Sequence, residues 1–598
     1  MIPAVLDIAS LEAGYRGGAF TPLDVAHALL ARIAEGADQS VWISRRSDHD
    51  ILAEARALTA RGPSGALWGV PFAVKDNIDA LGLPTTAACP AFAYQPEADA
   101  FAVANLKAEG ALLIGKTNLD QFATGLNGTR SPYGAPRCVF NSDYVSGGSS
   151  SGSAVAVASG QVSFALGTDT AGSGRVPAAF NNIVGVKPTR GLISTTGVVP
   201  ACRSLDCVTA FAVTVGDADR VRRVLQGDDP FDAYARAMTV RSLPLERFRF
   251  GVLAERDREF FGDHETGALY DAAIGRLEAL GGAAVAIDYA PFRDCAALLY
   301  GGPWVAERLA AIETFFAQHA GEMNATVRDI IAGAQGVSAV EAFRGAYALE
   351  AFRKAAAREW AKADFLLLPT APTIYSIDDM LGDPIALNAN LGRYTNFVNL
   401  LDCCAIAIPA GFRQDGLPAG VTLIAPAFAD DALAVIADRL HRAAPFGMGR
   451  DASATLPRES ALAMESKTLI PIVVVGAHLT GMPLNHQLTD AGGVLIKTCR
   501  TAGDYRLFVL PDTTPPKPGL VREPGFAGMG LDVEVWGLSQ AAFGAFVAAI
   551  PAPLGIGKIM LDDGAQASGF LCESYAVRDA QDITELGGWR AYIAAQSS

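Results

Sequence analysis

The chain has 598 residues, of which 50% are hydrophobic and 19% are charged. A chain of this length exceeds one compact core, so two or more domains are expected, and the composition argues against long disordered tracts. The formal net charge of −15 repels phosphate backbones and argues against nucleic acid as a partner.

The N-terminal segment lacks the basic region and the apolar core of a signal peptide, and no apolar run reaches the length of about 18 residues that a membrane span needs. The nine cysteines are scattered and never spaced as CxxC, which favours a reduced compartment over a disulfide scaffold or a zinc site. The adjacent Cys403 and Cys404 are expected to be small core residues rather than a redox pair. We expect a cytoplasmic protein.

Helices are predicted at the start of the chain, and an α/β region after Trp68. Thr21 and Pro22 form an N-cap followed by a proline at the first helical position, and apolar residues then recur at helical spacing as far as Ile33. The segments GVPFAVKDNID, ALLIGKTNLDQF and VSFALGTDT each join an apolar strand to a polar or glycine-bearing turn. This alternation predicts a large sheet covered by helices.

The domain boundaries follow from changes in composition. Residues 270–360 are rich in Ala, Leu and Glu and are expected to form several helices, and strands are expected at 364–370, 405–412 and 420–426. A long helix then closes a first domain, predicted over 1–450. Residues 451–466 are expected to be a linker, and residues 467–598 a second domain with its own strands.

A block rich in serine and glycine, residues 147–189, is the most informative segment. Ser173 is flanked by glycines on both sides, and four more serines stand at 149, 150, 151 and 153. Such glycines let the backbone approach a ligand closely. A flexible linker is the alternative, but the interleaved runs AVAVASG and VSFALG are expected to be buried. The block therefore predicts a serine-based catalytic site.

A serine nucleophile needs a base. Residues 148–152 match the GxSxG elbow of α/β-hydrolases, but no strand is expected before them, and no histidine of the first domain lies in a catalytic context, so the match is interpreted as fortuitous. Lys75 ends an apolar strand, where partial desolvation favours the neutral amine. A single lysine is more often a solvated surface charge, so the choice depends on the neighbouring motifs.

Four motifs resemble those of the amidase signature family. GGSSSGSAVAVASG and ALGTDTAGSGRVPAAFNNIVGVKPT resemble the two halves of the signature, GVPFAVKDN resembles the lysine motif, and GKTNLDQFATG resembles the strand and turn between them. The resemblance covers roughly 20–440. It implies an α/β fold with a large mixed β-sheet covered by helices. It also implies a Ser–cis-Ser–Lys triad with Ser173 as nucleophile, Ser149 as bridging serine and Lys75 as base.

The resemblance also assigns supporting roles. Backbone N–H groups near the nucleophile would form the oxyanion hole, chiefly those of Thr170, Ala171 and Gly172. Ser151 and Asp169 are expected either to orient the proton relay or to have a purely structural role. Ser151 and Ala171 stand where family members often have glycine, which suggests a tailored pocket.

The substrate is inferred from LLYGGPWVAERLAAI (298–312), which resembles a stretch of allophanate hydrolases. Tyr300 and Arg308 would share one face of a continuous helix, although Gly301-Gly302-Pro303 favour an interruption. The arginine would clamp a carboxylate, and the alternative is a surface arginine paired with a glutamate. The implied reaction deaminates allophanate to N-carboxycarbamate and ammonia.

The C-terminal segments VVVGAHLTGMPLNHQL, DYRLFVLPDTTPPKPGLVRE and LDVEVWGLS resemble the C-terminal domain of allophanate hydrolases. The resemblance implies a small α+β domain, similar to γ-glutamyl cyclotransferase-like folds, that promotes decarboxylation of N-carboxycarbamate. His478 is the predicted catalytic residue, and a packing histidine is the alternative. Asn485, His486 and Glu534 are weaker candidates.

Other functions stay open from the sequence. They are an amidase of other small carboxyamides such as malonamate, an A-type component of an amidotransferase, and a non-catalytic binding protein on an amidase scaffold. The acidic charge and the unrelated C-terminal domain argue against the second, and the intact triad argues against the third. No metal and no cofactor are expected. The resemblance implies a homodimer linked to a separate urea carboxylase in urea or s-triazine breakdown, without nucleic-acid or membrane partners.

Overall fold

The computed structural model describes residues 2–36, 39–239, 241–444, 446–457, 462, 469–511, 513, 515–538 and 540–596. The chain splits into two compact units, one formed by Met1–Met238 with Leu243–Leu462 and the other by Thr239–Ser242 with Ala463–Ser598. Within the linker predicted at 451–466, residues 458–461 and 463–466 lie outside the described residues. The exact domain boundaries stay a prediction.

The first unit is built on one 11-stranded mixed sheet with the order β1-β3-β2-β4-β6-β5-β10-β11-β9-β7-β8. The predicted large mixed sheet is therefore confirmed. Its strands are β1 (Trp42–Arg45), β2 (Pro71–Lys75), β3 (Leu112–Thr117), β4 (Phe164–Asp169), β5 (Val184–Lys187), β6 (Cys207–Ala212), β7 (Phe248–Leu253), β8 (Gly282–Ile287), β9 (Phe365–Pro369), β10 (Cys403–Phe412) and β11 (Pro418–Pro426).

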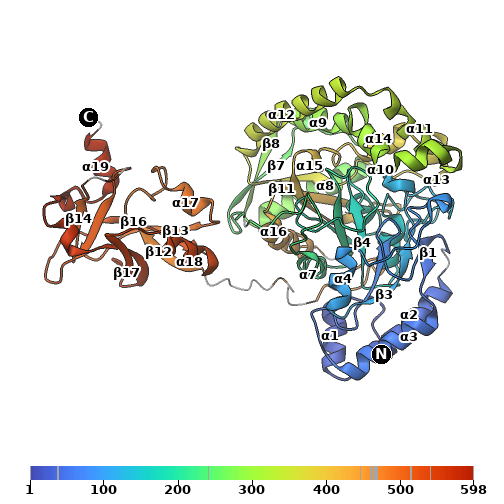
Figure 1. Cartoon of the computed structure of the whole chain (residues 1–598), viewed down its shortest axis with the longest axis horizontal. Helices are drawn as coiled ribbons and strands as arrows, with labels where there is room; N and C mark the ends of the chain where they lie inside the picture. The colour runs from blue at the N-terminus through green and yellow to red at the C-terminus, as the bar shows by residue number, and fades with distance from the viewer. Residues whose placement is uncertain are drawn as a thin grey trace. The chain divides into compact units, whose positions relative to one another are not determined.

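Helices cover the sheet, and α9, α11 and α12 run along the outside of this unit (Figure 1). Helix α5 packs against β2, β3, β4 and β6, and α6 packs against β5, β10 and β11. The described α-helices are α1 (Ile8–Arg16), α2 (Pro22–Glu35), α3 (Asp48–Arg61), α4 (Phe101–Ala108), α5 (Ser151–Ala158), α6 (Val176–Phe180), α7 (Val215–Leu225), α8 (His264–Ala279), α9 (Ala290–Gly301), α10 (Trp304–His319), α11 (Ala325–Ala332), α12 (Ala339–Trp360), α13 (Ile377–Gly382), α14 (Ala386–Leu391), α15 (Phe397–Leu400) and α16 (Asp430–Arg442).

Two neighbouring strands of the sheet, β2 and β4, bring their ends together. Strand β2 lies between β3 and β4 and is parallel to both. All residues of these three strands are buried, as is typical of strands covered on both faces. The carboxyl ends of neighbouring parallel strands meet at one edge of a sheet, which is where ligands bind in open α/β folds. Lys75 at the end of β2 therefore lies beside the end of β4.

The region 270–360 is mostly helical, as predicted, but it also contains strand β8, which the sequence does not predict. The short run GGAAVAI pairs in parallel with β7 at the sheet edge, and most of its residues are partly or fully exposed, so it carries no clear apolar periodicity. The predicted interruption at Gly301-Gly302-Pro303 is confirmed, because α9 ends at Gly301 and α10 begins at Trp304. A proline lacks the N–H that a continuous helix would need there.

The second unit is α+β, as expected from the resemblance. Within the described residues it contains a five-stranded sheet, β13-β16-β12-β18-β17, and a three-stranded sheet, β15-β14-β19. Its elements are β12 (Ile470–Val474), α17 (His486–Thr489), β13 (Val494–Arg500), β14 (Tyr505–Val509), β15 (Pro518–Arg522), β16 (Asp532–Leu538), α18 (Gln540–Ala548), β17 (Leu554–Met560), β18 (Gln566–Cys572), β19 (Gln581–Asp582) and α19 (Trp589–Gln596).

The cysteines behave as the sequence predicts. All nine are free, and Cys403 and Cys404 are each 1% exposed within the core of the first unit. In the part of the chain that the structure describes, no helix has the length and apolar character to cross a bilayer.

Candidate active site

Lys75, the predicted base, is buried more completely than the sequence suggested. It has no exposed surface, and its Nζ donates hydrogen bonds of 2.8 Å to Ser149 Oγ and to Thr168 Oγ1. Burial lowers the pKa of Lys75 to about 7, because desolvation penalises the ammonium form. A large fraction of Lys75 is therefore neutral near pH 7 and able to accept a proton.

Ser149, the predicted bridging serine, follows a cis peptide bond between Gly148 and Ser149. Its carbonyl accepts a 3.1 Å hydrogen bond from the N–H of Asp120. The carboxylate of Asp120 lies so close to Gly148 and to Gly125 that a Cβ on either glycine would overlap with it. The position of the Asp120 side chain thus requires glycine at both 125 and 148, and both glycines lie against it.

Ser173, the predicted nucleophile, lies in the turn after β4. We call residues 170–175 the serine turn. Ser173 Oγ donates to the carbonyl of Gly125 at 3.4 Å. Gly125, whose carbonyl accepts from Ser173, and Gly148, which precedes Ser149, both lie against the Asp120 carboxylate. The described residues show a direct Lys75–Ser149 hydrogen bond and none between Ser149 and Ser173.

Asp169 anchors the serine turn. Its carboxylate accepts the N–H of Gly174 at 3.0 Å and forms a two-point ion pair with Arg175, at 2.9 Å for each contact. Both side chains are fully buried. Burial alone would raise the pKa of Asp169, but Arg175 outweighs burial and the pKa is lowered. Asp169 is therefore ionised and contacts the turn rather than the Lys75 amine.

The predicted oxyanion-hole residues, Thr170, Ala171 and Gly172, open the serine turn. A Cβ at Gly172 would overlap with the side chain of Thr395, so the backbone there passes closer to Thr395 than any other residue would allow. The hydroxyl of Ser151 donates to the carbonyl of Asn118 at 3.4 Å.

Arg308 and Tyr300, predicted to bind the substrate, are brought together. Arg308 is 2% exposed, its guanidinium carbon lies 5.2 Å from the centre of the Tyr300 ring, and its Nη1 donates to Thr124 Oγ1 at 3.0 Å. The alternative, a surface arginine paired with a glutamate, is wrong, because Arg308 is buried and the adjacent Glu307 instead accepts two hydrogen bonds from Ser204.

A cleft of about 520 Å³ opens beside these residues. Its lining includes Tyr300 and Arg130, together with Leu126 and Asn396, which follow Gly125 and Thr395 in the chain. None of its described lining residues is acidic. The lining reaches the site through Tyr300 and through the chain neighbours of Gly125 and Thr395, and it does not include Arg308 or a residue of the serine turn. Its described lining residues suit an anionic ligand.

Residues 201–206, which we call the connecting loop, tie the serine turn to α10. The carboxylate of Asp206 accepts the Thr170 hydroxyl and the N–H groups of Ala201 and Cys202. At the other side, the N–H and hydroxyl of Ser204 donate to Glu307 at 2.6 and 2.8 Å. Burial raises the pKa of Asp206 to about 6.

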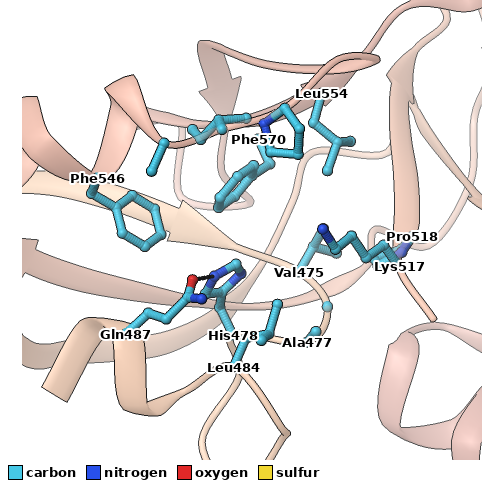
Figure 2. A pocket seen from close by; sticks show the side chains of 14 residues that line it. Val475, Ala477, His478, Leu484, Gln487, Lys517, Pro518, Phe546, Leu554 and Phe570 are labelled. Carbon is cyan, nitrogen blue, oxygen red and sulfur yellow. Dashed lines mark hydrogen bonds between the residues drawn. The ribbon is translucent and has the colours of Figure 1, made fainter. Parts of the chain in front are cut away.

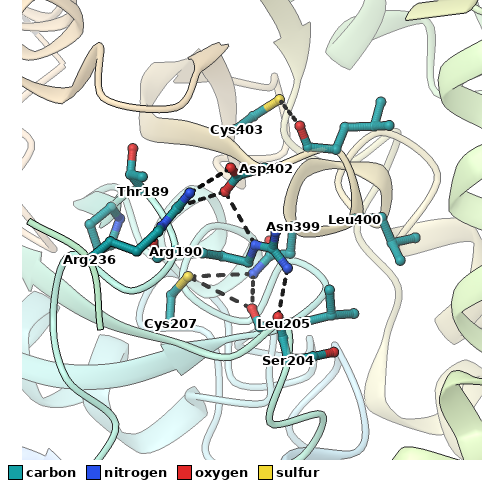
Figure 3. Close-up of polar contacts among 12 residues, drawn as sticks. Thr189, Arg190, Ser204, Leu205, Cys207, Arg236, Asn399, Leu400, Asp402 and Cys403 are labelled. Atoms are coloured by element: carbon teal, nitrogen blue, oxygen red, sulfur yellow. Dashed lines mark hydrogen bonds and ion pairs between the residues drawn. The ribbon is translucent and has the colours of Figure 1, made fainter. Parts of the chain in front are cut away.

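Figure 3 shows how this loop is held from outside. Arg190 donates to the carbonyl of Ser204 at 2.6 Å and pairs with Asp402, while Asn399 donates to the carbonyl of Leu205 at 2.8 Å. Asn399 also donates to the carbonyl of Asp169 at 2.8 Å. One amide side chain thus joins the connecting loop to the strand that leads into the serine turn.

Sequence reasoning missed several residues that contact the predicted site, among them Asp120, Thr124 and Thr168. The first two stand in GKTNLDQFATG, whose resemblance to the family indicates only a strand and a turn. Thr168 is the second-last residue of β4, which is parallel to the Lys75 strand, so a correct strand order would have placed its hydroxyl near the amine.

His478, the predicted catalytic residue of the second unit, lines a cavity of about 220 Å³. Its ring is hydrogen-bonded to Gln487 at 2.9 Å and stacked on Phe570. Figure 2 shows this hydrogen bond and Lys517 in the lining of the same cavity. Burial lowers the pKa of His478. The ring packs against aromatic residues and also borders the cavity, so packing and catalysis are compatible.

The weaker candidates in this unit have other partners. Asn485 donates to the carbonyl of His478 at 2.9 Å, and His486 contacts the carbonyl of Pro483 at 2.9 Å. The Glu534 carboxylate is bonded to its neighbours, Thr480, Trp536 and Arg590. Among the described residues no cluster of His, Cys, Asp and Glu side chains is arranged to hold a metal ion.

The buried Lys75 is bonded to Ser149, which follows a cis peptide bond, as the resemblance to the amidase signature family implies. The family model described as Amidase matches residues 24–434, and the model described as Allophanate hydrolase C-terminal domain matches residues 470–594. The chain therefore belongs to the amidase family and carries the C-terminal domain found in allophanate hydrolases.

Relatives agree with this family. The chain is 43% identical over 572 residues to urea amidolyase of Saccharomyces cerevisiae, a match that covers 93% of the chain and 31% of that protein. It thus spans about a third of that relative. A second urea amidolyase, from Lachancea kluyveri, is 43% identical over 574 residues, with the same coverage of 93% and 31%. The structure of Kluyveromyces lactis allophanate hydrolase matches with a TM-score of 0.74 and 40% identity, over 96% of this chain and 97% of that one.

Proposed function

We propose that the chain hydrolyses allophanate at the site formed by Ser173, Ser149 and Lys75. One observation carries the proposal: the buried cation Arg308 contacts Thr124, the residue before the Gly125 carbonyl that accepts from Ser173. A small amide that also bears a carboxylate can place its carbonyl at Ser173 and its carboxylate at Arg308 at the same time. The similarity to Kluyveromyces lactis allophanate hydrolase supports this substrate.

The proposed chemistry is a two-step acyl transfer. Neutral Lys75 accepts a proton from Ser149, which accepts one from Ser173 as its oxygen attacks the terminal amide carbonyl. Backbone N–H groups of the serine turn stabilise the oxyanion. The relay then runs in reverse and protonates the departing ammonia, which leaves an acyl-enzyme. Water attacks this ester with the same relay and releases N-carboxycarbamate.

Ammonia release from allophanate by the purified chain tests the proposal, with malonamate, biuret and propionamide as comparison substrates. We expect strong activity on allophanate, loss of it in Ser173→Ala, and a raised KM in Arg308→Ala. Activity on propionamide with none on allophanate would leave the triad standing and remove the substrate assignment. Preference for malonamate would favour an amidase of other carboxyamides.

A second activity is proposed for the second unit, because His478 and Lys517 border one cavity. There His478 promotes loss of CO2 from N-carboxycarbamate, and the resulting carbamate breaks down to ammonia and a second CO2. The test is a time course of ammonia release by His478→Asn. We expect the first equivalent to appear at the wild-type rate and the second to be delayed. Equal rates for both equivalents would remove the role of His478.

We further propose that the chain acts as a homodimer and receives allophanate from a separate urea carboxylase. The link to a urea carboxylase is supported by the 43% identity over 572 residues to urea amidolyase of Saccharomyces cerevisiae and by the match to the structure of Kluyveromyces lactis urea amidolyase. Light scattering after size-exclusion chromatography tests the dimer. Ammonia release from urea, ATP and bicarbonate, with and without an added urea carboxylase, tests the link.

A further inference from the structure

A second guanidinium lies buried beside the threonine that Arg308 contacts. Arg130 is 2% exposed, and its Nη1 donates to the carbonyl of Thr124 at 2.9 Å, while Nη2 donates to the carbonyl of Pro384 at 2.5 Å. Arg308 donates to the hydroxyl of the same Thr124. The two arginines therefore reach two polar groups of one residue, next to the Gly125 carbonyl that accepts from Ser173.

Both guanidiniums lack an anionic partner within the described chain. Neither forms a direct ion pair among the described residues, although Asp120 favours the charged form of Arg130, and Asp206 and Glu307 that of Arg308. The Nε of each is buried without a hydrogen-bond partner. An arginine stays protonated in a protein, and a buried charge is costly unless it is paired. Two such cations at one place indicate a site that is completed by an anion.

The nearby carboxylates are already occupied. Asp120 accepts the backbone N–H groups of Asn127, Gly128 and Arg130 at 3.0–3.2 Å. Asp206 and Glu307, the acidic neighbours of Arg308, are bonded within the serine turn and the connecting loop. Within the described residues these carboxylates already have other hydrogen-bond donors, so an anion that pairs directly with both arginines would be an external one. Arg130 lines the cleft through which such an anion can enter.

We propose that Arg130 is a specificity-determining residue that binds the substrate carboxylate together with Arg308. The inference rests on the proposed function and refines it. Two cations bind a carboxylate more strongly than a carboxamide of the same shape. The carboxamide has no charge, and its NH2 group is a donor that faces the guanidinium donors. The site should therefore prefer allophanate to biuret, and malonamate to malonamide.

Substitution of Arg130 should change this preference rather than the chemistry. In Arg130→Gln we expect kcat/KM for allophanate to fall by about 10- to 100-fold, mainly through KM, because a charge-assisted hydrogen bond is lost. Activity on biuret should fall clearly less than activity on allophanate, since biuret loses no charged contact and shares only the lost support of Thr124 and Pro384. Arg130→Lys keeps the positive charge but loses the two-point hydrogen bonding of the guanidinium. Its kcat/KM for allophanate should lie between those of the wild type and Arg130→Gln.

Arg137→Gln is the matched control, because Arg137 is exposed in the same segment and the variant has the same net charge. Thermal melts confirm that each variant is folded, and Arg130→Lys decides the question if Arg130→Gln does not fold. An equal loss on allophanate and biuret in the decisive variant, or an unchanged allophanate-to-biuret ratio, would overturn the inference and leave Arg130 as a support for Thr124 and Pro384.

The same measurements separate this inference from the proposed function. If the wild type does not act on allophanate but hydrolyses malonamate, the substrate assignment fails, and the ratio of malonamate to malonamide activity tests Arg130 instead. If the wild type prefers the uncharged amide of each pair, both proposals fail.

Discussion

The hydroxyl of Thr170 donates a short hydrogen bond to the carboxylate of Asp206. Thr170 belongs to the serine turn, and Asp206 ends the connecting loop, whose Ser204 is bonded to Glu307 on α10. The next residue of that helix is Arg308. The turn that carries the proposed nucleophile and the helix that carries the proposed carboxylate ligand are thus joined by two hydrogen-bonded carboxylates.

Asp206→Asn should impair the chemical step. The amide cannot accept from the Thr170 hydroxyl and from two N–H groups at once, so the proposed oxyanion-hole backbone loses a support. We expect kcat to fall by about 10- to 100-fold, less than or equal to the loss of one direct oxyanion donor, with little change in KM. Steady-state kinetics on allophanate measure both constants.

The pH profile distinguishes this role from a merely structural one. Since the pKa of Asp206 is about 6, its carboxylate is protonated as the pH falls below that value and one acceptor is lost. The wild-type acid limb should therefore steepen below pH 6, and the Asn variant should not show this. Thr170→Val removes the same hydrogen bond, so the double variant should lose no more than either single variant. Additive losses would contradict the coupling.

Glu307→Gln should act on substrate binding. Glu307 accepts from both the N–H and the hydroxyl of Ser204, and the amide can accept only one of these. Helix α10, which carries Arg308, should then be held less firmly against the connecting loop. We expect the KM for allophanate to rise about three- to tenfold and kcat to stay nearly unchanged. Glu313→Gln, on an exposed position of the same helix, is the control. A fall in kcat alone would contradict this role.

Asp217→Asn should stabilise the first unit in a pH-dependent way. Burial and the nearby Asp7 raise the pKa of Asp217 to about 7, above its unfolded value. The stability that the protonated group provides at low pH is therefore lost as the pH rises through about 7. The amide has no such loss, so we expect a gain of about 2–4 kcal/mol at pH 8 that shrinks toward pH 4.

Calorimetry at pH 4, 6 and 8 measures this difference. Asp219→Asn is the control on the same helix. Asp219 is paired with Arg222 and Arg223, and breaking such a buried pair destabilises. A gain for Asp217→Asn that is equal at all three pH values would show that titration of this group is not the cause.

The sequence predicts the features that depend on local pattern. The buried strands that end at Lys75 and Asp169, the helix break at Gly301-Gly302-Pro303 and the α+β second unit all follow from apolar runs, turn residues and motif resemblance. Strand β8 escapes prediction because an exposed edge strand carries no periodicity. The predictable features concern residues whose neighbours in the chain determine their structure.

The contacts of the site depend on residues far apart in the sequence and could not be predicted. Arg308 reaches Thr124 across 184 positions, and Asn399 reaches Asp169 across 230. Neither pair has a local signature, because strand order and loop path decide which side chains meet. For the same reason the sequence alone does not distinguish a buried Arg308 from a surface one.

The pH dependence of the reaction should report Lys75. A base must be neutral, and the pKa of Lys75 is about 7. Apart from the steeper fall expected below pH 6, kcat/KM should therefore rise with pH as Lys75 loses its proton and level off above pH 7. Thr168→Val removes the hydroxyl that accepts from the Lys75 ammonium. Because that bond favours the charged form, its loss should move the midpoint down by about 0.5–1 pH unit.

Thr209→Val is the matched control for this shift. Thr209 lies on strand β6, where it pairs with Gly167 of the neighbouring strand β4. Among the described residues the Thr209 hydroxyl has no hydrogen-bond partner. The control makes the same change of atoms without removing a bond to the amine, so its midpoint should stay at the wild-type value. If Thr168→Val lowers activity while its midpoint stays at about 7, the group that titrates is not Lys75. A midpoint that moves only in Thr168→Val assigns the titration to the lysine, because that variant alone changes what the ammonium contacts.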